Sequence, residues 1–331
     1  MRRREFFIAL LTATAAAGPS TPRAQPSASR PRIGVLMGFP ESDARGQAYV
    51  LAMRTKLESL GWVEGRNITI DYRWAGGDRE KARTFAKELI GMAPRVIVTS
   101  TNQVTETVRQ ETQTIPIVFA SLGDPVGSGL VASPAKPGGN VTGFPVFVDS
   151  MGSKWLELLR EIAPRVERAG FLFHPDAVPN VGLLRAAQSA APPMKLKLVP
   201  LAVRDAAEIK SAISAFAAEG DRGGLVVATH AVTLSNRDII IGLAASNHLP
   251  TVFGDLVFAE SGGLLSYGSD IGALFEGAAS YVDRILKGAK PADLPVQLPT
   301  KFDLVINLKT ARELGLNVPA RLLVGVSRVI E

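Results

Sequence analysis

The chain of 331 residues contains no cysteine, which excludes disulfide bonds, thiolate metal sites, cysteine nucleophiles and a lipid-modified N-terminal cysteine. Histidine is scarce, and none of the three histidines has metal-ligand spacing with another histidine or with an acid. The sequence has no G-x-S-x-G nucleophile elbow and no phosphate-binding loop ending in G-K-[ST]. We therefore expect no metal, no cofactor and no catalytic residue.

The first residues have the pattern of an export signal. Arginines at positions 2–4 precede an apolar stretch over 6–18, and a small residue at Ala24 offers a cleavage site. The apolar stretch is shorter than the ~20 residues that a membrane-spanning helix needs. The pattern predicts a signal peptide over 1–24 and a linker over 25–31, although a buried or frayed N-terminal helix is the alternative. The expected location is the periplasm, by the Sec or twin-arginine route and without a lipid anchor.

Positive charge is in excess, but much of the excess lies in that leader. The whole chain has a formal net charge of +6, and residues 1–24 carry four arginines and one glutamate, so the remainder carries +3. The remaining basic residues are scattered, with no lysine or arginine stripe and no interleaved aromatic residues. This pattern does not indicate a nucleic-acid-binding surface.

From Arg32 onward, buried-strand patterns alternate with amphipathic-helix patterns. The run 32–38 is continuously apolar, as in a strand covered on both faces, and 43–60 places apolar residues at helical spacing. The same rhythm recurs to the C-terminus and predicts an α/β fold of doubly wound, mostly parallel sheets. About ten strands could form one large sheet or two smaller ones.

Three irregular segments rich in glycine or proline favour two lobes joined by a three-strand hinge. These segments are 123–145, 253–263 and 287–301. If the chain crosses between lobes at each of them, one lobe is discontinuous. The expected bounds are 32–145 plus 259–295 for the first lobe, 146–258 for the second, and 296–331 for a C-terminal segment that completes the hinge and packs on the lobes.

Polar and aromatic residues that follow strands are the candidates for ligand contact. In open α/β sheets, ligands bind outside the carboxyl ends of the strands, where helix N-termini point. The candidates are Phe39, Ser100, Thr101, Ser121, Asp124, His174, Thr229, Asp255 and Tyr267.

Several of these candidates also have a plainer structural explanation. Thr101 is placed to cap a helix, Asp124 to form a turn before Pro125, and Asp255 to be a solvated loop acid. The two aromatic candidates are alternatively packing residues. Hydroxyls, carboxylates and backbone amides can hold a small polar molecule, but they do not supply a nucleophile with a base.

Two function classes follow from these residues. The first is an exported receptor that binds a small polar molecule without chemistry. The alternative is an exported α/β small-molecule enzyme that uses His174 or His230 with an acid. Substitution of both histidines would leave binding largely intact in the first class and abolish turnover in the second.

Several long segments, in order, resemble the substrate-binding proteins of bacterial ABC transporters with the type I periplasmic binding fold, of the kind grouped with tryptophan- and tyrosine-import receptors. The basic leader belongs to the resemblance, which extends over nearly all of 32–331. The segments are 60–78, 114–144, 262–268 and 281–316.

The resemblance implies a monomer that traps an amino acid or related carboxylate, with aromatic ligands among the options, and delivers it to an inner-membrane permease with a cytoplasmic ATPase. It implies that Ser100 and Thr101 hold the ligand carboxylate and that Asp255 holds its ammonium group. The second lobe departs from the family pattern, because His174 stands where asparagine is frequent and 229–233 replaces a common aspartate–proline pair. A receptor that signals to a sensor kinase is a third possibility.

Overall fold

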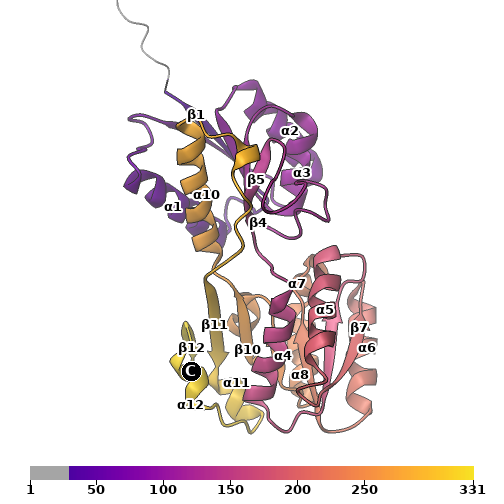
Figure 1. Cartoon of the computed structure of the whole chain (residues 1–331). Helices are drawn as coiled ribbons and strands as arrows, with labels where there is room; N and C mark the ends of the chain where they lie inside the picture. The colour runs from indigo at the N-terminus through magenta and orange to yellow at the C-terminus, as the bar shows by residue number, and fades with distance from the viewer. Residues whose placement is uncertain (1–29) are drawn as a thin grey trace, which may run out of the picture. The chain divides into compact units, whose positions relative to one another are not determined.

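Two separate sheets organise the chain, as the α/β prediction with two lobes requires (Figure 1). The structure is a computed structural model and describes residues 30–331. The signal peptide expected over 1–24 and most of the linker expected over 25–31 lie outside the described residues. Residues 31–331 form one compact unit by their contacts.

The first lobe, residues 31–145 and 271–298, contains a five-stranded parallel sheet in the order β2-β1-β3-β4-β5. Its strands are β1 (Arg32–Met37), β2 (Thr69–Trp74), β3 (Val96–Ser100), β4 (Ile117–Leu122) and β5 (Val141–Pro145). Its helices are α1 (Ala44–Ser59), α2 (Arg79–Gly91), α3 (Asn102–Glu111) and α10 (Ile271–Leu286).

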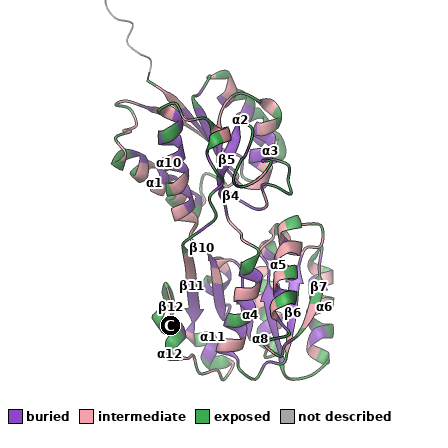
Figure 2. Ribbon diagram, in the orientation of Figure 1, coloured by how far each residue is buried: buried purple, intermediate pink, exposed green. Residues whose placement is uncertain are grey.

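Side-chain alternation along β1 explains why this sheet is covered on both faces. Ile33, Val35 and Met37 pack with α1 and α10, whereas Leu36 packs with α2 and α3 on the opposite face. Successive residues of a strand point to opposite faces, so a continuously apolar strand needs helices on both sides. The predicted doubly wound arrangement is therefore confirmed, and Figure 2 shows the strands of this sheet buried between exposed helix surfaces.

The second lobe, residues 146–270 and 302–331, contains a seven-stranded sheet in the order β12-β11-β10-β9-β8-β6-β7. The sheet is parallel except that β11 runs antiparallel to β10. Its strands are β6 (Arg168–Phe173), β7 (Lys197–Ala202), β8 (Gly223–Val227), β9 (Thr251–Phe253), β10 (Leu265–Ser269), β11 (Phe302–Asn307) and β12 (Arg328–Ile330).

Helices cover both faces of this sheet as well. The helices α4 and α5 pack on one face, with α6 and α8 on the other. The helices of this lobe are α4 (Ser150–Ile162), α5 (Val178–Ala190), α6 (Ala206–Ala218), α7 (Ala231–Ser235), α8 (Arg237–Ser246), α9 (Leu256–Glu260), α11 (Leu308–Glu313) and α12 (Ala320–Val324). A short 3-10 helix, η1 (Pro291–Asp293), follows α10 in the first lobe.

The chain passes between the lobes at three places, one of which differs from its expected position. The crossings lie between β5 and α4, between β10 and α10, and between η1 and β11. Residues 259–269 were expected in the first lobe, yet β10 pairs with β9 and β11 in the second. The glycine-rich run 253–263 is not a crossing, because it holds only the turns around α9. Within the described residues, no helix is long and apolar enough to cross a membrane.

Candidate functional site

Thr101 has a strained backbone at the carboxyl end of β3, where α3 begins. Its φ of 61° and ψ of 155° lie in a region that is essentially restricted to glycine, and Thr is β-branched. The Thr101 side chain makes no capping hydrogen bond to α3. It stands instead over Gly38, where an added Cβ would lie 2.6 Å from Thr101 Oγ1. The hydroxyl is therefore held beside the open N-terminus of α3 at an energetic cost.

Ser100, the preceding residue, has a different position. Its side chain is fully buried, and its Oγ accepts a hydrogen bond from the Gly38 backbone N–H at 2.8 Å. This bond ties the end of β3 to the residue that follows β1. The Ser100 hydroxyl therefore positions the ends of two strands. Its partner, the Gly38 N–H, could not be foreseen from the sequence.

Ser121 is the second strained hydroxyl residue, one strand further along the sheet. Its φ is 66°, and the register of β4 against β5 shifts between Ala120 and Leu122, which makes Ser121 the bulged residue. Bulges re-aim a side chain near functional sites. Because Ser100 pairs with Ala120 in register, the next residues, Thr101 and Ser121, leave adjacent strand ends.

Asp124 orders the loop that follows Ser121. Its Oδ1 accepts backbone N–H bonds from Val126 at 3.0 Å and Gly127 at 2.8 Å. The Asn102 side chain accepts from Gly123 N–H at 2.8 Å and ties this loop to the start of α3. The turn explanation for Asp124 therefore matches the geometry.

His174 and His230 lie ring against ring in the second lobe. Their centroids are 4.1 Å apart with an interplanar angle of 29°. His174 follows β6, and its Nδ1 accepts the Asp176 backbone N–H at 3.3 Å. His230 is the N-cap of α7, and its Nδ1 accepts the Val232 backbone N–H at 3.2 Å. The sequence placed both histidines at strand ends without indicating that they touch.

Burial lowers the pKa of His230, and the neighbouring His174 lowers it further. Both effects favour the uncharged imidazole. The acid nearest in sequence to His174, Asp176, lies 3.3 Å from Arg204 Nε. Each Nδ1 faces a backbone N–H, and among residues 30–331 no acid forms a hydrogen bond or ion pair with either ring, as the enzyme alternative would require.

Asn180 is a positioning residue that sequence reasoning missed. Its side chain is buried; Oδ1 accepts from His174 N–H, and Nδ2 donates to the Thr229 carbonyl, both at 3.1 Å. It thereby holds the ends of β6 and β8 together. Thr229 Oγ1 is buried and has no hydrogen-bond partner among residues 30–331.

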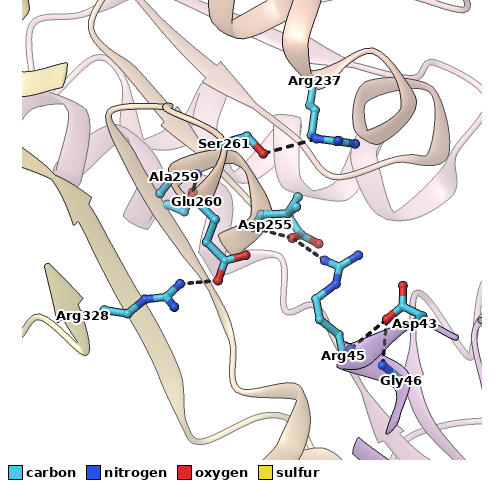
Figure 3. A network of polar contacts seen from close by, with 11 residues as sticks. Asp43, Arg45, Gly46, Arg237, Asp255, Ala259, Glu260, Ser261 and Arg328 are labelled. Carbon is cyan, nitrogen blue, oxygen red and sulfur yellow. Dashed lines mark hydrogen bonds and ion pairs between the residues drawn. The ribbon is translucent and has the colours of Figure 1, made fainter. Parts of the chain in front are cut away.

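Asp255 caps α9 and faces an arginine of the first lobe. Its Oδ1 accepts the Val257 N–H at 3.0 Å and lies 3.8 Å from Arg45 Nη1 (Figure 3). Burial raises the pKa of Asp255, although the Val257 N–H and Arg45 oppose that shift. Arg45, in the first turn of α1, is a candidate that the sequence pattern did not mark.

The two aromatic candidates both pack on other aromatic rings. Phe39 meets Tyr49 edge-on at 5.9 Å, and Tyr49 stacks on Phe275 at 5.6 Å. Burial raises the pKa of Tyr49 to about 12, so its phenol is neutral. Tyr267 stacks on Phe302 at 5.4 Å. Phe39 and Tyr267 thus each make at least one packing contact, as the alternative explanation for these residues expects.

A cavity of about 530 Å³ opens between the Gly123–Val126 loop, the crossing at 145–149 and the start of α5. Its size is within the range of small-molecule sites. Among the nine predicted contact residues only Asp124 lines it, so the structure does not gather all nine around one cavity. In the described part of the chain, no group of three or more histidines and acids is arranged to hold a metal ion.

Comparisons with known proteins agree with this architecture. A sequence model of the family described as ABC transporter substrate binding protein matches residues 35–330. The tyrosine-binding protein of Clostridioides difficile is 26% identical over 284 residues, which cover 86% of this chain and 80% of that protein.

Two solved structures are also similar. An ABC domain from Streptococcus pneumonia in complex with L-Trp has a TM-score of 0.78 and 26% identity, covering 91% of this chain and all of that one. A conserved domain protein from Vibrio cholerae has a TM-score of 0.77 and 29% identity, covering 91% of this chain and 99% of that one.

Proposed function

Since the chain belongs to the family of ABC transporter substrate-binding proteins, we propose that it captures an amino acid or related carboxylate between its two lobes. The family and the relatives above are solute-binding proteins rather than enzymes, and members act outside the cytoplasm. We further propose export to the periplasm, action as a monomer, and delivery to an inner-membrane permease with a cytoplasmic ATPase.

The strained pair Thr101 and Ser121, on adjacent strand ends, is the observation that carries this proposal. Strain of this kind persists where the surrounding structure over-determines it, and it concentrates at ligand-binding positions. Thr101 is the N-cap residue of α3 and Ser121 leaves the adjacent strand. The unpaired N–H groups and the dipole at that helix end favour a negative charge. A ligand carboxylate is the group that this corner suits.

Asp255 is our candidate for the ligand ammonium group. Its carboxylate lies at the carboxyl edge of the second sheet, where only one of its oxygens is used to cap α9. The ligand ammonium would take the place that Arg45 holds at 3.8 Å in this structure. Relatives that bind tyrosine or are solved with L-Trp make aromatic amino acids the first ligands to test.

Closure would follow from the distribution of these groups. The carboxylate site belongs to the first lobe and the ammonium site to the second, so a ligand satisfies both only when the lobes approach. Its higher affinity for that state drives the hinge motion.

Thermal shift of the protein starting at residue 25 tests the proposal, with the common L-amino acids and small organic acids as the panel. A ligand present at ~100 times its Kd is expected to raise the Tm by about 5–10 °C. Isothermal titration then gives the stoichiometry, expected to be one. Absence of any shift across the panel would overturn the proposal.

Asp255→Asn tests the ammonium site, with Asp205→Asn as the matched control. Both residues cap a helix through Oδ1, and Asn keeps that cap, but Asp205 is exposed at the start of α6. We expect Asp255→Asn to weaken binding of an amino acid about 10-fold or more. The same acid without its amino group should bind Asp255→Asn and Asp205→Asn with equal affinity. If Asp255→Asn weakened binding of the amino acid and of this analogue equally, the assignment would be contradicted.

A further inference from the structure

Several groups among the candidate residues can donate hydrogen bonds to a ligand. The first lobe offers the Thr101 and Ser121 hydroxyls and the N-terminus of α3, and the second lobe offers the two histidine rings and the Thr229 hydroxyl. The two carboxylate acceptors are already engaged, because Asp124 accepts bonds in its own turn and Asp255 faces Arg45. Such a site suits a ligand richer in acceptor oxygens than one carboxylate provides.

The histidine hydrogen bonds determine which nitrogen of each ring carries a proton. A backbone N–H always donates, so Nδ1 of His174 and of His230 must be the acceptor. In the neutral imidazole the proton then resides on Nε2, the nitrogen farther from the backbone. Each of the two stacked rings therefore carries an Nε2–H donor, and no acceptor among residues 30–331 takes either bond.

The same tautomer argues against a metal ligand pair. An imidazole binds a metal through an unprotonated nitrogen, and both Nδ1 atoms already face backbone N–H groups. Metal binding at Nε2 would require a proton on Nδ1, opposite a backbone donor. The pair is thus arranged to donate hydrogen bonds.

Asn180 and Thr229 make this pair a built feature of the lobe. Asn180 links the His174 N–H to the Thr229 carbonyl, so the backbone of His174 is tied to the residue that precedes His230. Thr229, the residue before His230, has a buried hydroxyl without a partner that lies over Gly254. Three donors of one lobe therefore lack acceptors in the described protein.

We propose that His174 and His230 determine specificity by donating both Nε2–H groups to a second acceptor oxygen of the ligand, distinct from its α-carboxylate. The proposal rests on the proposed function and names its ligand class: an acid with an additional carboxylate or hydroxyl oxygen at its far end. A ligand without that oxygen would leave the donors desolvated and unpaired, and sites of this kind reject such analogues strongly.

Matched ligand pairs and matched variants test the proposal by isothermal titration. The ligand pairs are L-tyrosine with L-phenylalanine, and L-glutamate with L-norvaline, each differing by one oxygen-bearing group. The variants are His174→Asn and His230→Asn, because Asn retains an acceptor near the Nδ1 position but lacks the Nε2 donor. His248→Asn is the control, since His248 is exposed and its φ of 52° suits Asn.

The wild-type protein is expected to prefer the oxygen-bearing member of at least one pair by about 10-fold or more. Each His→Asn variant should reduce that preference by about 5–10-fold while leaving the oxygen-free member within about 3-fold. His174→Gln and His230→Gln place an amide nitrogen near the Nε2 position and should restore part of the preference. Unchanged circular dichroism would show that the variants fold.

The failure of this inference can be told from the failure of the proposed function. Binding without a preference for the oxygen-bearing member, or equal losses for both members in the variants, overturns the role of the histidines alone. Absence of binding to every member, together with absence of a thermal shift across the whole panel, overturns both. A preference that His248→Asn also removes would overturn the assignment to this pair.

Discussion

His174 and His230 stack at 4.1 Å between ring centroids, and burial together with His174 lowers the pKa of His230. In the unfolded chain His230 takes up a proton near pH 6.5, its ordinary pKa. In the folded protein the pKa is lower, so protonation favours the unfolded chain. The contribution of the uncharged His230 to the free energy of unfolding is fully present above that pH, and it is lost as the pH falls below it.

We expect the Tm to fall on acidification from pH 8 to 5, and to fall less in His230→Asn, as measured by circular dichroism. The raised pKa of Asp255 acts in the opposite direction, but both proteins share it. Superimposable pH profiles would show that His230 is not perturbed in the folded state.

Thr101→Gly should stabilise the protein while weakening ligand binding. Glycine adopts a φ of 61° without strain, which relieves roughly 1–3 kcal/mol, less about 0.5–1 kcal/mol for the added freedom of the unfolded chain. Urea denaturation is expected to show a gain of about 1 kcal/mol, and titration about a 10-fold loss of affinity.

Ala93→Gly is the matched control for this change. Ala93 is exposed and has a φ of 51° just after the C-cap of α2, so glycine should stabilise it as well. Ala93 is not one of the candidate contact residues, so Ala93→Gly should leave the affinity for the ligand unchanged. A loss of stability in Thr101→Gly would contradict the strain argument.

Asn180→Ala should cost about 2–3 kcal/mol of unfolding free energy. The variant leaves the His174 N–H and the Thr229 carbonyl without partners in a buried place. Asn247→Ala also removes a side-chain bond, from Nδ2 to the Leu243 carbonyl, but on an exposed helix end, and should cost less than about 0.5 kcal/mol. Equal costs in urea denaturation would contradict the role of Asn180.

Gly152→Ala should disrupt the contact between α4 and α5. An added Cβ at Gly152 would lie 2.0 Å from the Leu183 carbonyl oxygen, so the two helices must separate, at about 2–3 kcal/mol or more. In Gly242→Ala, on α8, the added methyl meets nothing within 4 Å and should stabilise the helix by about 0.5–1 kcal/mol. Opposite shifts of Tm are the expected result.

Much of the fold could be predicted from local patterns. The helix expected over 43–60 begins with Asp43 as its N-cap, whose side chain accepts two backbone N–H bonds. The lobe boundary near 259 could not be predicted, because the apolar pattern of 262–268 indicates a strand but not the sheet that the strand joins. Its place was decided by pairing with β9 and β11, and the partner β11 lies more than 30 residues further along the chain, after α10 of the other lobe.

The amino-acid sequence by itself determined the alternation of strands and helices, the two-lobed α/β class and the strand ends at which polar residues gather, because apolar periodicity and helix capping act over a few residues. Only the tertiary structure decided that His174 meets His230, that Asn180 joins their strands and that Arg45 faces Asp255. These relationships depend on which strands become neighbours, and that choice is made by packing across the whole chain.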